Sequence, residues 1–265
     1  WAVAAHHLGR SDEAEEVWKK ALSLMETMTE RERYRTLGTY YMVVSGNFQK
    51  AIENFEELVA KFPADGAGHN NLAVSYFSTL DFERAMAEGQ KVLEIYPNSL
   101  FYKQNAALYA MYAGDFESAE AKGREVISAD ESRYYARLPV AIAALSRGDF
   151  DAARAAYEDM AKTGEPGASH ANLGLADLEI YRGRYEEAIE VLGRARDRNP
   201  DYIPVQAYLT ASYIELGREA DAGTAAAEFK RLSPRTPLTE WRHRLPYKDQ
   251  MITERLLVNL RKAGI

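Results

Sequence analysis

Residues that could perform catalysis or hold a metal ion are sparse in this chain. It contains no cysteine, which excludes disulfides, thiolate metal sites and thiol redox chemistry. No two histidines stand four residues apart, the spacing that would place two ligands of one metal ion on the same helix face. We therefore predict no metal site and no cofactor, and we interpret the histidines as surface or packed side chains. They are His6, His7, His69, His170 and His243.

Other patterns associated with enzymes are also missing. Gly66 and Gly68 lack the third glycine and the preceding strand of a phosphate-binding loop, and no Gly-x-Ser-x-Gly elbow occurs. The acidic residues Glu53, Glu56 and Glu57 are interpreted as a solvated helix face, because catalytic carboxylates need a cleft that perturbs them. The sequence therefore predicts that this chain is not an enzyme.

The elements expected to position a binding site are helices, because residues 66–98 have a helix–turn–helix pattern. Ala73 and Ala85 are small enough for the two helices to cross closely, and Pro97 ends the second helix. Asp81 lies in the turn, where its carboxylate can accept a hydrogen bond from a free amide at the start of the second helix. Large residues complete the pattern at Leu72, Tyr76 and Phe82.

The same pattern recurs every 34 to 37 residues along the chain. The turn position is taken by Gly9, Gly46, Leu80, Gly114, Gly148, Gly183 and Gly217. Five residues later an alanine always follows, at Ala14, Ala51, Ala85, Ala119, Ala153, Ala188 and Ala222. Glycine suits a reversal between antiparallel helices because it tolerates positive φ. The period therefore predicts an array of stacked helical hairpins.

This pattern resembles the tetratricopeptide repeat (TPR). The resemblance implies an all-α right-handed superhelix, an α-solenoid of about six full repeats with a truncated first repeat and a C-terminal capping helix. Residues 1–31 would form the truncated repeat and a connection, residues 32–234 the six units with turns at 46, 80, 114, 148, 183 and 217, and residues 235–265 the basic cap helices. Because the first unit begins halfway along a helix at Trp1, we expect the chain to be part of a longer protein.

Four places depart from the regular pattern. The second unit has one residue too many before Gly46, so we expect a slightly irregular first helix there. In the sixth unit the close-packing pair is either Leu173–Gly174 or Leu175–Ala176. Residues 163–167 are the best candidate for a break or bend. Pro139 either kinks the first helix of its unit or opens its first turn.

The C-terminal segment differs in charge from the array. The net charge of −7, which argues against general nucleic-acid binding, divides into −12 for residues 1–230 and +5 for residues 231–265. After a short helix over residues 238–244 and a break at Pro246, a helix from about Asp249 carries an apolar face. That face is interpreted as a cap over the last repeat, with a basic docking helix as the alternative. Its residues are Ile252, Leu256 and Leu260.

In a TPR superhelix the first helix of each unit lines the concave groove. Asn71 and Asn105 occupy equivalent places, and their amides could hold the backbone of an extended peptide. Pro139 interrupts this ladder, and Asn172 continues it under only one of the two alignments; alternatively, the amides bond within the array. No lysine and arginine set forms a clamp for a C-terminal carboxylate. The predicted peptide-binding residues are Asn70, Asn71, Val74, Phe77, Phe101, Gln104, Asn105, Leu108, Met111, Tyr112, Tyr135 and Leu138.

Two stretches resemble signalling proteins. Residues 29–73 resemble the TPR region that follows the kinase domain in bacterial eukaryotic-like serine/threonine kinases. Residues 245–265 resemble the tail of TPR-bearing class III adenylate/guanylate cyclases, with Asn259 where that tail usually has glycine. Neither set of catalytic motifs is present. The resemblance implies the interaction region of a larger bacterial signalling protein.

We therefore predict a protein–protein interaction scaffold that binds a peptide or partner segment in the groove. Homotypic assembly, autoregulation of an upstream catalytic domain and small-ligand sensing are the alternatives. No stretch is apolar enough to span a membrane and the N-terminus lacks the features of a signal peptide, so we expect a cytoplasmic protein that binds no nucleic acid.

Overall fold

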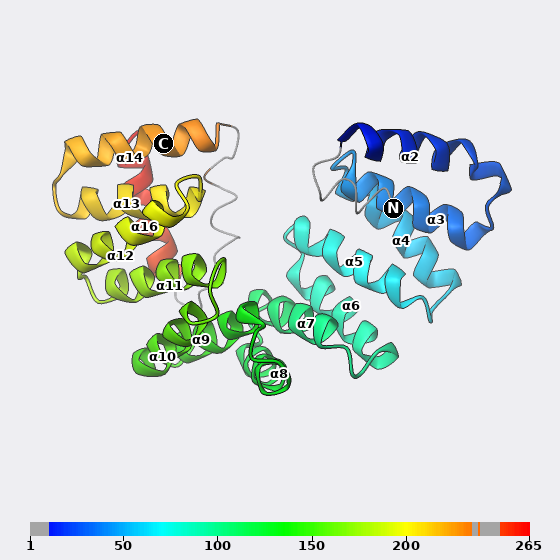
Figure 1. Cartoon of the computed structure of the whole chain (residues 1–265), viewed down its shortest axis with the longest axis horizontal. Helices are drawn as coiled ribbons and strands as arrows, with labels where there is room; N and C mark the ends of the chain where they lie inside the picture. The colour runs from blue at the N-terminus through cyan, green and yellow to red at the C-terminus, as the bar shows by residue number, and fades with distance from the viewer. Residues whose placement is uncertain (1–10, 235–237, 239–249) are drawn as a thin grey trace. The chain divides into compact units, whose positions relative to one another are not determined.

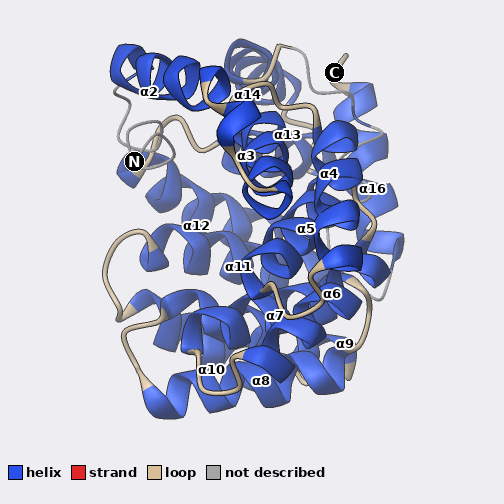
Figure 2. Ribbon diagram, turned by 90° about the vertical axis from the view of Figure 1, so that its right-hand side faces the viewer, coloured by secondary structure: helices blue, strands red, loops and turns tan. Residues whose placement is uncertain are grey.

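The computed structural model describes residues 11–234, 238 and 250–265. The first turn at Gly9, the pair His6 and His7, the start of the chain at Trp1 and the break at Pro246 lie outside this part, as does most of the short helix expected over residues 238–244. In the described residues every regular element is a helix (Figure 2). The prediction of an all-α repeat fold is confirmed, since the helices pack in consecutive pairs.

The helices follow one another along the chain in the order that Figure 1 shows. Their bounds are α2 Ser11–Ser23, α3 Glu30–Val43, α4 Phe48–Lys61, α5 Gly66–Ser78, α6 Phe82–Ile95, α7 Leu100–Tyr112, α8 Phe116–Ala129, α9 Arg137–Ser146, α10 Phe150–Ala161, α11 Gly167–Tyr181, α12 Tyr185–Arg198, α13 Ile203–Glu215, α14 Glu219–Leu232 and α16 Gln250–Lys262, with short 3-10 helices η1 Met25–Thr27 and η2 Tyr134–Ala136.

The chain forms two compact units, residues 1–109 and 110–265, and the division lies within α7. The first unit has a core of α3 to α7 side chains that includes Phe55, Leu72 and Tyr76. The second unit has one core around Tyr157 and Leu178 and another around Leu192 and Tyr208. The loop of residues 163–167 lies inside the second unit.

The turns keep a common backbone geometry. Leu80 has a φ of 65°, and the glycines at the equivalent positions have φ between 62° and 84°. After most turns the first amide donates to the carbonyl five residues before it, as Asp81 does to Tyr76 at 2.9 Å. Asn47 instead donates to Tyr41, six residues before it. The extra residue therefore lies in the turn, and the expectation of an irregular first helix is wrong because α3 runs unbroken from Glu30 to Val43.

Small residues allow the close helix crossings that the pattern predicts. The alanines that follow the described turns by five residues are at most 1% exposed. On the first helices, Ala73, Ala107, Ala141 and Ala176 are fully buried seven residues before their turns. Ala176 is therefore the equivalent of Ala73, which selects the Leu175–Ala176 alignment. Under this register Gly174, and not Asn172, is the equivalent of Asn71.

Helix starts differ along the array. The side chains of Asn47, Asp81, Asp115 and Asp149 each accept a hydrogen bond from the backbone three residues later, which confirms the role predicted for Asp81. Helices α11, α12, α13 and α14 begin without a side-chain cap. Pro139 is the third residue of α9, so it opens the first turn, where its missing amide hydrogen costs no intrahelical bond.

Candidate functional site

The candidate site is the first-helix surface, by which we mean the outward positions on the first helices of the repeats. In the first unit these positions lie on α5 and on residues 100–109 of α7. All the residues predicted there are partly or fully exposed, and Phe101 is 52% exposed. They are Asn70, Asn71, Val74 and Phe77 on α5, and Phe101, Gln104, Asn105 and Leu108 on α7.

Two contacts fix this surface in the first unit. The ring of Phe77 packs against the rings of Phe82 and Tyr109 at 5.4 and 5.5 Å between centroids, which ties α5 to both α6 and α7. Asn70 Nδ2 donates to Asn71 Oδ1 at 3.1 Å. One amide pair thus bonds locally, while the Asn105 side chain has no hydrogen bond to another described residue.

The second unit carries the other predicted positions. Tyr112, Tyr135 and Leu138 are partly exposed. Met111 is fully buried, because it continues the buried stripe of Ala107 and Ala110 on α7, so we exclude it from the surface.

Tyr135 belongs to an aromatic cluster around His170 that was not predicted from the sequence. The ring of His170 lies 5.5 to 5.7 Å from the rings of Tyr134, Tyr135 and Tyr202, measured between centroids. His170 Nδ1 donates to the carbonyl of Pro166 at 3.0 Å, which fixes the plane of the ring. Burial raises the pKa of Tyr202 to about 12, so its phenol stays neutral. Tyr135 and His170 both stand thirteen residues before their turns, and this shared register on successive first helices would have placed the two side by side.

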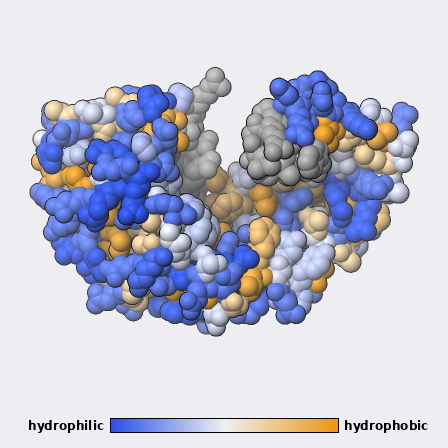
Figure 3. Space-filling model, viewed as in Figure 1, coloured by the Kyte–Doolittle hydropathy of each residue, from blue (hydrophilic) through white to orange (hydrophobic). Residues whose placement is uncertain are grey.

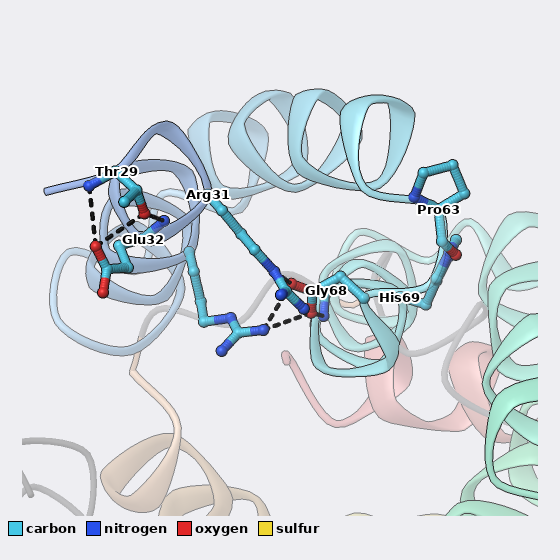
Figure 4. Close-up of polar contacts among 8 residues, drawn as sticks. Thr29, Arg31, Glu32, Pro63, Gly68 and His69 are labelled. Carbon is cyan, nitrogen blue, oxygen red and sulfur yellow. Dashed lines mark hydrogen bonds and ion pairs between the residues drawn. The ribbon is translucent and has the colours of Figure 1, made fainter.

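An ion-pair cluster joins α3 to α5 beside the first-helix surface (Figure 4). Asp65 is 1% exposed, and its carboxylate accepts hydrogen bonds from Arg31 at 2.8 Å, from Arg35 at 2.6 Å and from the Gly68 amide at 2.9 Å. Burial alone would raise the pKa of Asp65, but the bonds from Arg31, Gly68 and Arg35 outweigh it and hold the pKa below its ordinary value. The cluster caps α5 and fixes it against α3.

His69 is a packed side chain, one of the two environments expected for the histidines. Its ring is buried, with Nδ1 2.5 Å from Glu88 Oε2 and Nε2 2.9 Å from the carbonyl of Pro63. Both ring nitrogens face oxygen acceptors, so neither is available to a substrate. Among the described residues no group of three or more histidines and carboxylates could hold a metal ion.

The first-helix surface of the last repeat is covered by α16. This helix packs against α13, and Leu256, Leu257 and Leu260 are at most 6% exposed in the core cluster that contains Tyr208. The burial of Leu256 and Leu260 confirms the predicted apolar face. At its edge, Glu215 of α13 accepts a hydrogen bond from Asn259 at 2.7 Å and pairs with Arg255 at 3.0 Å.

Surface hydropathy alone does not mark a site. The face drawn in Figure 3 is mostly hydrophilic, with small separate apolar patches. Single exposed apolar residues are ordinary on soluble proteins. The candidate site is therefore assigned from the positions of residues on the first helices and not from surface hydropathy. None of the described helices is long and apolar enough to cross a membrane.

Solved structures with a similar fold are diverse. A chain of the APC/C hetero-tetramer Cut9–Hcn1 matches with a TM-score of 0.67 and 14% identity, over 98% of this chain and 48% of that one, so this chain spans about half its length. A tetratricopeptide repeat protein from Parabacteroides merdae ATCC 43184 matches with a TM-score of 0.60 and 18% identity, over 89% and 92% of the two chains. The type IV pilus biogenesis factor PilW matches with a TM-score of 0.60 and 18% identity, over 78% and 94%. At these identities the likeness concerns the fold.

Sequence comparison gives the family. No curated protein sequence matches significantly. Profiles described as tetratricopeptide repeat match residues 43–99, 105–169, 144–213 and 179–237, which together make up most of the chain. With the paired helices and the common turn geometry, these matches show that the chain belongs to the tetratricopeptide repeat family.

Proposed function

We propose that this chain is a protein-interaction scaffold that holds a peptide or partner segment on its first-helix surface. The observation that carries the proposal is the set of partly exposed amides and apolar side chains at equivalent positions of α5 and α7. Asn71 and Asn105 stand nine residues before their turns, and Val74 and Leu108 stand six before them. Amides can bond to a partner's backbone, while Phe101 and Leu108 offer apolar contacts to its side chains.

The experiment is capture of partners from a bacterial lysate with mass spectrometry. The chain is compared with an Asn71→Ala/Asn105→Ala variant and with a matched Gln49→Ala/Gln90→Ala variant, which removes two exposed amides from the second helices α4 and α6. All three should have the same helical content. A partner held by the wild type and the control but lost by the first variant supports the proposal. Equal capture by all three contradicts it.

The setting we propose is a larger bacterial signalling protein. This part rests on the resemblance of residues 29–73 and 245–265 to kinase- and cyclase-associated repeat regions. None of the solved structures named above is a kinase or a cyclase. Identification of the captured partners tests the setting, since proteins with no part in signalling would contradict it and leave the scaffold proposal intact.

A further inference from the structure

The starting point is the place at which α16 lies. The small cavity between α13 and α16, about 20 Å³, is lined on the α13 side by Tyr208, Ala211, Ser212 and Glu215. Tyr208, Ala211 and Glu215 stand nine, six and two residues before the turn at Gly217. These are outward positions of a first helix. The equivalent residues are Asn71, Val74 and Ser78 on α5, and Asn105, Leu108 and Tyr112 on α7.

The chain therefore seats one of its own helices on the positions that we propose as a partner site elsewhere in the array. The contact between α16 and α13 resembles the binding of a partner helix in a groove. Leu256, Leu257 and Leu260 supply the apolar face at i, i+1 and i+4. Arg255 and Asn259 meet a single carboxylate, that of Glu215, at the edge. An amphipathic helix that lays its apolar face into a groove is a common mode of binding.

The polar groups at this contact are incompletely satisfied. Tyr185 Oη and Ser212 Oγ, on α12 and α13, are buried without a hydrogen-bond partner among the described residues, and so is Thr253 Oγ1 on α16. Tyr185 and Ser212 line the cavity, and Thr253 lies on the same face of α16 as Leu256 and Leu260. Nearly all buried polar groups in permanent cores are paired, because each unpaired group costs stability. Three unpaired hydroxyl groups therefore gather at this one contact, and each of them lowers the cost of separating α16 from α13.

We propose that α16 is a displaceable occupant of the α13 surface, and that the partner that replaces it is an amphipathic helix of the same chemistry. Such a helix carries leucines at i, i+1 and i+4 and a cationic or amide side chain facing Glu215. The inference rests on the proposed scaffold function and specifies its partner. It concerns α13 and not Asn71 or Asn105, so the two proposals are tested at different residues.

The first test is hydrogen exchange of the unmodified chain, followed peptide by peptide. If α16 detaches on its own, amides of residues 253–260 exchange about 100-fold faster than those of residues 205–212, because local opening precedes global unfolding. Equal protection of the two segments would show that α16 leaves only when the repeat unfolds, which overturns the proposal. No variant is needed, so a folding failure does not confuse this result.

The second test uses a fluorescent peptide of residues 250–265 and two variants of the full chain. Leu257→Asp/Leu260→Asp releases the chain's own helix, whereas Val258→Asp/Lys262→Asp changes two exposed side chains and leaves it docked. The first variant should bind the peptide at least about tenfold more tightly, because a tethered helix competes at an effective millimolar concentration. Equal binding by both variants, or by neither, overturns the proposal. Dimerisation of the wild type at the same concentrations would identify α16 of a second copy as the helix that occupies α13. That result would overturn the proposal that the occupant belongs to a different protein.

Discussion

Replacement of Asp65 by alanine tests the ion-pair cluster between α3 and α5. The change removes the cap of α5, which typically contributes about 1 kcal/mol. It also removes the charge-assisted hydrogen bonds that Asp65 accepts from Arg31 and Arg35. Both arginine side chains are about half exposed, at 49% and 44%, and regain water when the carboxylate is lost. We therefore assign Arg31 and Arg35 together the lower value for a charge-assisted hydrogen bond, about 1.5 kcal/mol. The expected loss in the opening free energy of α3 and α5 is about 2 to 3 kcal/mol.

The assay is hydrogen exchange, since repeat arrays do not unfold as one unit and a single melting curve would mix both compact units. Asp149→Ala is the matched control. It removes a carboxylate that caps α10 by accepting from the Ala152 amide at 3.0 Å, so about 1 kcal/mol should be lost there. A loss at Asp65 no larger than the loss at Asp149 would refute the argument, because the arginines would then contribute nothing.

The same carboxylate should make stability depend on pH in a defined direction. The pKa of Asp65 is lowered by folding, so its stabilising effect is complete above the unfolded value of about 4 and is lost as the pH falls through the folded value. We expect the difference in exchange protection between wild type and Asp65→Asn to be full at pH 7 and to shrink below about pH 4. A difference that stays constant down to the lowest pH would contradict the assignment.

Two other substitutions follow from the backbone and the packing. Leu80→Gly should stabilise the first unit by about 0.5 to 1 kcal/mol, because it relieves a left-handed leucine at φ 65° that costs more than the added flexibility of glycine. Faster hydrogen exchange of the first unit in this variant than in the wild type would contradict the prediction. Gly174→Ala should destabilise the second unit by about 1 to 3 kcal/mol, since the added methyl would lie 2.2 Å from the buried Tyr157 ring, whereas Gly193→Ala, with nothing within 4 Å, should be neutral or stabilising. Equal hydrogen-exchange protection of the second unit in the two alanine variants would show that the Tyr157 ring moves aside without cost and would contradict the prediction.

The helical repeat could be predicted from the sequence because its constraints are local. A turn glycine and an alanine five residues later are enough to place two helices, and both positions have the expected geometry. What could not be predicted is where a departure from the regular period is accommodated. The extra residue before Gly46 could sit in the helix or in the turn, and only the bond from Asn47 to Tyr41 places it.

The candidate site was predictable in position and less so in composition. The outward register on α5 identifies exposed side chains, but the same reasoning included Met111, which is fully buried. Helical periodicity gives a face, whereas the width of the buried stripe depends on what packs against the helix. His170 was interpreted only as a surface or packed histidine because its aromatic neighbours come from two distant segments of the chain, Tyr134 and Tyr135 in one and Tyr202 in the other. The apolar face of α16 was predictable from its periodicity, whereas the positions on α13 that it covers were not.

The uneven distribution of helix caps has a consequence for how the chain is made. Side-chain caps stabilise the starts of α3, α4, α5, α6, α8 and α10, whereas α9 and α11 to α14 begin without them. Repeat arrays nucleate where local stability is greatest and grow outward by pairing each new hairpin with its neighbour. We therefore expect folding of this array to begin among α3 to α8, which are synthesised before α11 to α14, so that the less stable hairpins are added to repeats that have already formed.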